Sequence, residues 1–83
     1  MIDGMQAARK AVEYLQRFST DMRMSGPIAR TRLEEVDLSE DEKYWLITLG
    51  WDEDDLGIRR VYKVFKVDSE TGKVVSMRMR EPA

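Results

Sequence analysis

Apolar and polar positions near the start of the chain recur with the period of an α-helix. The apolar stripe consists of Met5, Ala8, Val12, Leu15 and Met22, and Ala11 and Phe18 widen it. Charged and amide side chains occupy the opposite side. Asp3 and Gln6 have the spacing of a capping box, and Gly26-Pro27 is a stop signal. The pattern predicts a helix at about residues 3–20.

After Pro27 the period changes from that of a helix to that of a strand. Strands are predicted at about residues 28–38, 44–51, 59–67 and 73–80, with polar connections between them. The second of these is the clearest. Four large apolar side chains alternate along it and share one face: Trp45, Ile47, Leu49 and Trp51. We expect that face to pack on the helix.

Two positions predict departures from a regular strand or turn. Leu33 and Val36 have opposite parity, so a straight strand would place one of them in water. A β-bulge near Glu34-Glu35 resolves the conflict. In the hairpin turn after the third strand, Asp68 is placed to accept backbone amides and Gly72 to adopt the left-handed conformation.

The element order predicts an α+β fold. One helix precedes four strands, and all the connections are short, which favours antiparallel neighbours. We expect an N-terminal helix packed on one face of a four-stranded antiparallel β-meander, with residues 1–83 forming one domain.

The closing hairpin resembles that of the PepSY domain family. The match covers residues 62–75, with an aromatic and β-branched strand, an Asp-x-x-Thr-Gly turn at Asp68 to Gly72, and a second β-branched strand. The alanine-rich helix and the acidic turn upstream are similar too. The resemblance implies a small module that binds or restrains a partner. It brings no catalytic residue, and Asp68, Thr71 and Gly72 carry over as turn residues.

Composition argues against catalysis and cofactors. The chain has no cysteine and no histidine, so thiolate chemistry and the commonest proton-transfer side chain are both missing. The acidic run from Asp52 to Gly57 fails as an EF-hand loop, because Leu56 and Lys63 occupy positions that need oxygen ligands. We therefore expect no enzyme activity, metal site or cofactor. No signal peptide or membrane-spanning run is visible, and a cytoplasmic location is the expectation.

Arginine-bearing strands offer one alternative function. Arg30 and Arg32 share a strand face, as do Arg78 and Arg80. A nucleic-acid-associated protein would place them on one continuous basic surface. The net charge of −2 argues against this interpretation, and charges on edge strands also deter aggregation.

The face of the sheet that the helix leaves uncovered is the main functional hypothesis. If Val75, Met77 and Met79 face the helix, the opposite face gathers five residues: Tyr44, Leu46, Tyr62, Val64 and Val74. The placement of Tyr62 and Val64 depends on whether the third strand bulges near Phe65-Lys66. Such a patch predicts a non-catalytic binding or regulatory module, associating with a protein partner or with a second copy. Ordinary cross-strand packing among half-exposed side chains is the alternative.

Overall fold

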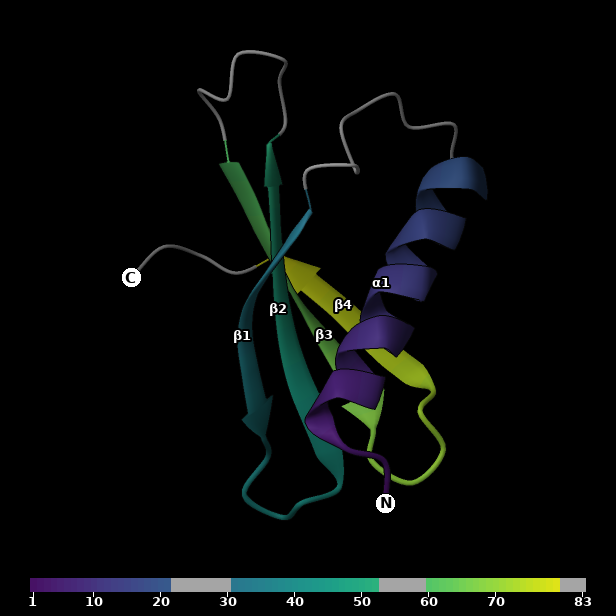
Figure 1. Ribbon diagram of the computed structural model, residues 1–83, viewed down its shortest axis with the longest axis vertical. Coiled ribbons are helices and arrows are strands. Elements are labelled where there is room, and N and C mark those ends of the chain that lie inside the picture. Colours follow the sequence, from purple (N-terminus) through teal and green to yellow (C-terminus); the bar gives the residue numbers. More distant parts are fainter. Residues whose placement is uncertain (22–30, 53–59, 80–83) are drawn as a thin grey trace.

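The computed structural model describes residues 1–21, 31–52 and 60–79. Helix α1 (Gly4–Asp21) is followed by β1 (Arg32–Leu38), β2 (Tyr44–Asp52), β3 (Arg60–Asp68) and β4 (Val74–Met79). The strands form one sheet in the order β1-β2-β3-β4, and every neighbouring pair is antiparallel. Helix α1 packs across one face of this sheet (Figure 1). The predicted α+β meander is therefore confirmed. Residues 28–30 of the first predicted strand lie outside the described residues.

The start of α1 is fixed by the predicted capping box. The backbone N–H of Gln6 donates to Asp3 Oδ1 at 2.8 Å, and the N–H of Asp3 donates to Gln6 Oε1 at 2.9 Å. The residue before the cap is tied to the sheet. Ile2 donates its N–H to the carbonyl of Ser69 at 2.7 Å and accepts the indole N–H of Trp45 at 3.0 Å. These bonds fix the N-terminal end of the helix against the sheet.

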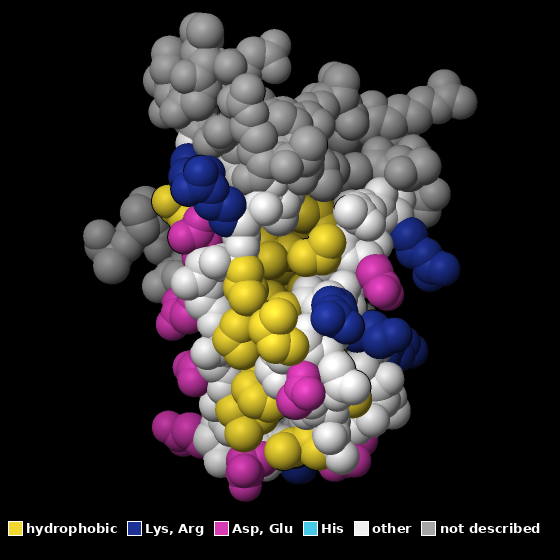
Figure 2. Space-filling view, viewed as in Figure 1, with side chains coloured by type: hydrophobic (Ala, Val, Ile, Leu, Met, Phe, Trp, Pro, Cys, Tyr) yellow, Lys and Arg dark blue, Asp and Glu magenta, His cyan; other side chains and the backbone are white. Residues whose placement is uncertain are grey.

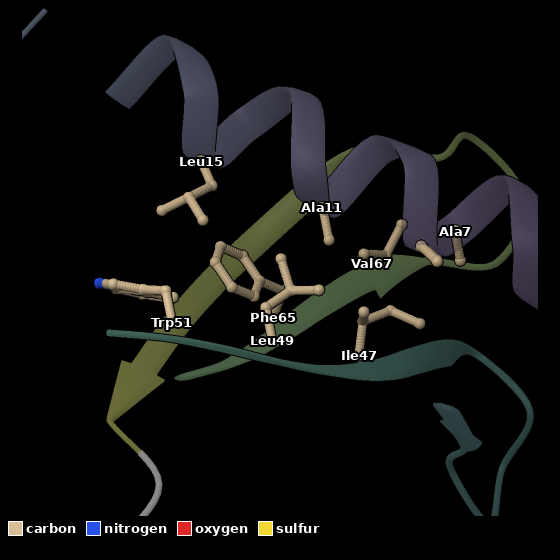
Figure 3. Packing of buried hydrophobic residues seen from close by; sticks show 9 residues of the cluster. Ala7, Ala11, Leu15, Ile47, Leu49, Trp51, Phe65 and Val67 are labelled. Carbon is tan, nitrogen blue, oxygen red and sulfur yellow. The ribbon is translucent and has the colours of Figure 1, made fainter. Parts of the chain in front are cut away.

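The core lies between α1 and the middle of the sheet. Ala7, Ala11 and Leu15 point from the helix toward the sheet (Figure 3). They meet a layer of strand side chains comprising Ile47, Leu49, Trp51, Phe65 and Val67. The predicted helix-facing side of β2 is thus confirmed.

The buried stripe of α1 differs in one respect from the predicted stripe. Its centre is Ala7 and Ala11, both fully buried, because small side chains let the helix lie close to the sheet. Met5 is about 100° or more around the helix from that centre, and it is 61% exposed. The expected place of Met5 in the core is wrong.

The bulge predicted in β1 is confirmed. The pairing of β1 with β2 shifts between Leu33 and Glu35, so that Leu33 and Val36 both lie on the helix side. The helix nevertheless leaves these two side chains 44% and 39% exposed. Figure 2 shows a band of hydrophobic side chains down this face, with acidic side chains along its outer margin. Sequence reasoning did not anticipate this band.

A second bulge, in β4, changes the side of the sheet on which the first residues of this strand lie. Residues 60–68 pair regularly with β2, but between β3 and β4 the register shifts from Lys66↔Ser76 to Val67↔Val74, which leaves Val75 as the extra residue. Val74 therefore packs against the core, and Val75 is 48% exposed. The predicted placements of Val74 away from the helix and Val75 toward it are both wrong.

The rest of β4 follows its predicted parity. Met77 packs against the core as expected. Met79 pairs with Lys63 on the helix side, but its side chain is 64% exposed, so it does not fill the core.

The hairpin turn between β3 and β4 adopts the predicted conformation. Gly72 has a φ of 75°, and Asp68 Oδ1 accepts the backbone N–H groups of Glu70 and Thr71 at 2.8 and 2.9 Å. The buried residue Ser69 connects this turn to the turn between β1 and β2. Its hydroxyl donates to the carbonyl of Glu42 at 2.8 Å. Both hairpin turns and the N-terminus are thus held at one end of the sheet.

Candidate functional site

The open face is the surface of the sheet opposite α1. Directly paired residues share a face, so the register assigns its members strand by strand. They are Arg32, Glu35 and Asp37 from β1; Tyr44, Leu46, Thr48 and Gly50 from β2; Arg60, Tyr62, Val64, Lys66 and Asp68 from β3; and Ser76 and Arg78 from β4. The two bulge residues Glu34 and Val75 join them, because Glu34 reaches Gly50 and Val75 lines a groove with Leu46 and Val64.

Four of the five predicted patch residues lie on the open face. Tyr44, Leu46, Val64 and Tyr62 lie in four successive open-face pairs of the regular β2–β3 register: Tyr44↔Asp68, Leu46↔Lys66, Thr48↔Val64 and Gly50↔Tyr62. Val74 is missing from the patch because the β4 bulge turns it into the core. The structure supplies Val75 in its place.

The aliphatic centre of the open face is a shallow groove. It is lined by Leu46, Val64, Lys66, Val75, Ser76 and Arg78, and encloses about 360 Å³. Leu46 and Val64 are half-buried by their neighbours, whereas Val75 is exposed. The groove is therefore apolar in its floor and basic along the β3–β4 side.

Both tyrosine rings of the patch are covered by cations. Lys66 Nζ lies 4.2 Å from the centre of the Tyr44 ring, and Arg60 Cζ lies 5.7 Å from that of Tyr62. Arg60 is in turn held by Glu34, whose Oε1 accepts its guanidinium N–H at 2.6 Å. Sequence reasoning missed these cations, although the period of two in β3 places Lys66 on the same face as Tyr62. The predicted patch is thus less apolar than its tyrosines suggest.

Because Gly50 has no side chain, Glu34 and the Tyr62 ring can lie over the backbone of β2. A Cβ at Gly50 would lie 3.1 Å from the Tyr62 ring and 3.1 Å from Glu34 Oε1. The ring therefore covers the glycine backbone of the central strand, which explains why Gly50 is buried on the face opposite the described helix. Thr48, next on this face, is likewise buried at 3% exposure.

Charge is distributed asymmetrically across the open face. Glu35 and Asp37 lie on β1, while Lys66 and Arg78 lie on β3 and β4. One cross-strand row shows the polarity clearly, since it runs from Glu35 through Thr48 and Val64 to Arg78. The next row also starts with an acid, and it runs Asp37, Leu46, Lys66 and Ser76. Glu35 and Asp37 thus lie at the β1 edge together with Arg32, Lys66 and Arg78 lie toward β4, and apolar side chains lie between them.

The arginines of the described strands do not form a continuous basic surface. Arg32 and Arg78 both lie on the open face, but on opposite edge strands, and Glu35 and Asp37 share the β1 edge with Arg32. Arg30 and Arg80 lie outside the described residues. Within the part of the chain that the structure describes, a nucleic-acid backbone would meet a basic margin at the β4 edge but a mixed one at the β1 edge.

A second groove lies between α1 and the start of β4. It encloses about 820 Å³ and is lined by Lys10, Glu13, Tyr14, Gln16, Arg17, Lys73 and Val74. Tyr14 packs edge-on against Phe65 with ring centres 6.2 Å apart, so its ring supports the core beneath the groove. The groove combines opposite charges without the shielded pair of acids that general acid–base catalysis needs.

Two carboxylates in the turns of the described residues have lowered pKa values. Hydrogen bonds from the Ser39 hydroxyl and the Lys43 N–H hold the pKa of Asp41 below its usual value. The N–H groups of Thr71 and Glu70 lower the pKa of Asp68 in the same way. Both carboxylates stabilise turns.

Within residues 1–21, 31–52 and 60–79, no three Asp or Glu side chains gather into a possible metal site. The acidic run 52–57, considered for calcium, lies outside the described residues except for its first residue.

Among the described residues, no helix combines the length and the apolar character that crossing a membrane requires. In comparisons with known proteins, no family model, no curated protein and no solved structure matches the chain.

Proposed function

We propose that this protein is a small, non-catalytic binding module that associates through the open face of its sheet. The occupant we assign to that face is a second copy of the chain. The resemblance of residues 62–75 to the PepSY family is compatible with a binding role and stays a prediction.

The charge polarity of the open face carries this proposal. A surface that carries more acids than bases at one edge and bases toward the other complements itself when a second copy is turned over onto it. Leu46, Val64 and Val75 supply an aliphatic centre that a facing sheet can exclude from water. Lys66 and Arg60 lie over the tyrosine rings and reduce the aromatic surface that a single copy exposes.

The test is to place a charge in the aliphatic centre. Leu46→Arg would bury an unpaired guanidinium in the interface and leave the helix-facing core intact, so association should be lost. Light scattering across a concentration series should show the wild-type mass rising from 9.7 kDa toward twice that value. The variant should stay at the monomer mass throughout.

Met5→Arg is the matched control. Met5 is 61% exposed on α1, on the other side of the sheet, and receives the same new charge. It should associate as the wild type does. A wild type that stays monomeric up to high micromolar concentration contradicts the proposal. Loss of association in both variants would also contradict it, by showing that the effect is not specific to the open face.

A further inference from the structure

We infer that the groove between α1 and the start of β4 binds an acidic segment of a partner protein. This groove lies on the helix side of the sheet, so the inference goes beyond association through the open face and does not rest on it. Three cations line the groove: Lys10 and Arg17 from α1, and Lys73 from the turn before β4. Within the part of the chain that the structure describes, none of the three takes part in an ion pair.

Two separate elements bring these cations together. Lys10 and Arg17 are seven positions apart on α1, so they lie on one side of the helix, about 10.5 Å apart along its axis. The turn supplies Lys73. The side chain of Lys10 lies over this turn, because a Cβ at Gly72 would be 3.4 Å from Lys10 Cε and 3.5 Å from Lys10 Cγ. The helix and the turn therefore concentrate positive charge in one groove.

The acids near the groove do not neutralise this charge. One acid, Glu13, lines the groove, so its lining carries three cations and one carboxylate, a net charge of +2. Glu13 lies four positions before Arg17, but the two side chains form no ion pair in the structure. In the nearby turn, Asp68 accepts two backbone N–H groups, and Glu70 lies 3.6 Å from the N-terminal ammonium group. Both of these acids line a different hollow of the surface.

The shape of the groove fits a short stretch of polypeptide. Its volume of about 820 Å³ lies within the range of ligand sites, about 300–1,000 Å³. Tyr14 and Val74 give it a partly apolar lining, on which the uncharged residues of a segment can pack. An extended chain advances about 3.4 Å per residue, so acids about three residues apart can reach Lys10 and Arg17. Gln16 also lines the groove but already has an interaction within the chain, so we assign it no role.

The single carboxylate in the groove favours a peptide over a nucleic acid. Every nucleotide of a strand carries a phosphate, and one of these phosphates would face Glu13. A peptide can place an uncharged residue opposite Glu13 and acids opposite the cations. Like charges opposed across an interface are unfavourable, so the mixed lining selects a segment in which acidic and uncharged residues alternate.

The test uses a fluorescein-labelled peptide in which glutamate and aspartate alternate with valine, followed by fluorescence anisotropy at low ionic strength. The wild type should bind it. Arg17→Glu and Lys73→Glu should each raise the Kd about five- to tenfold, because each opposes a new carboxylate to the acids of the peptide. Arg9→Glu is the matched control. It makes the same change at an exposed arginine of α1 that does not line the groove, and it should leave the Kd unchanged.

A further variant separates recognition from damage to the fold. Glu13→Gln removes the one carboxylate of the lining and should lower the Kd about threefold, which a merely destabilised protein would not do. Leu46→Arg, on the open face, should bind the peptide as the wild type does, so this test is separate from that of the proposed function. Absence of peptide binding by the wild type overturns the inference. So does equal weakening by Arg9→Glu and Arg17→Glu, or tighter binding of oligothymidylate than of the peptide.

Discussion

The two faces of the sheet are covered in different ways. On the helix side, Ile47, Leu49, Phe65 and Val67 have no exposed surface, since α1 lies directly over them. On the open face, no described helix covers the strands, and side chains cover one another in pairs. Lys66 lies over Tyr44, and Arg60 lies over Tyr62. Adjacent residues of β3 thus belong to two kinds of surface.

This difference separates what holds the fold from what is free to bind. Burial of apolar area stabilises the helix side, and that term depends on close packing among fixed neighbours. The pairs of the open face involve partly exposed cations, whose contribution to stability is small because water screens them. Such contacts can be exchanged for contacts with a facing copy at little cost. The open face can therefore change without loss of the fold.

The largest expected effect compares neighbouring residues of β3. Phe65→Ala should lower the free energy of unfolding by about 3–5 kcal/mol, because it leaves a cavity under α1. Val64→Ala, one residue away on the open face, should cost at most about 1.5 kcal/mol. Urea unfolding of the two variants measures the contrast. Equal losses of unfolding free energy in the two variants would show that the two faces contribute equally to stability.

The next effect concerns the turn between β3 and β4. Gly72 closes this turn at a φ of 75°, two residues before Val74 enters the core. Gly72→Val should destabilise the protein by about 1–2 kcal/mol or more, because a β-branched residue is strained there. Its Cβ would lie 3.4 Å from the flexible Lys10 side chain, so strain rather than collision dominates. A thermal melt of Gly72→Val that matches that of the wild type would contradict the expected strain at this position.

The smallest effect is a pH dependence from the same turn. Amide donors from Thr71 and Glu70 lower the pKa of Asp68, so its charge favours the folded state. That stabilisation is present above the ordinary pKa of 3.8 and is lost as pH falls through the lower folded-state value. Asp68→Asn keeps an oxygen acceptor but does not titrate. The stability difference between wild type and variant should shrink on acidification in urea titrations at a series of pH values. A stability difference between the two proteins that stays constant down to acid pH would show that the titration of Asp68 does not affect stability.

Sequence reasoning succeeded where neighbouring residues decide the structure. The Asp3–Gln6 capping box, the left-handed Gly72 and the amide bonds to Asp68 all depend on residues within a few positions. The bulge at Glu34 was visible as well, because Leu33 and Val36 conflict in parity within one strand. Alternation in β2 identified the core side of the sheet. Tyr44 and Leu46 of the patch followed from the same alternation, and Tyr62 and Val64 followed from that in β3, which pairs with β2 without a bulge.

Tertiary structure decided the rest, because those features depend on how separate elements meet. Two consecutive valines, Val74 and Val75, fit either face, and only the pairing of β4 with β3 places the bulge that selects between them. The exposure of Met5 and Leu33 depends on where α1 crosses the sheet. Neither the apolar pattern of the helix nor that of β1 contains this information. The pairing of Glu34 with Arg60, 26 positions apart, likewise arises only when β1, β2 and β3 lie side by side. Local propensity fixes backbone conformation, whereas the identity of a surface depends on contacts between distant segments.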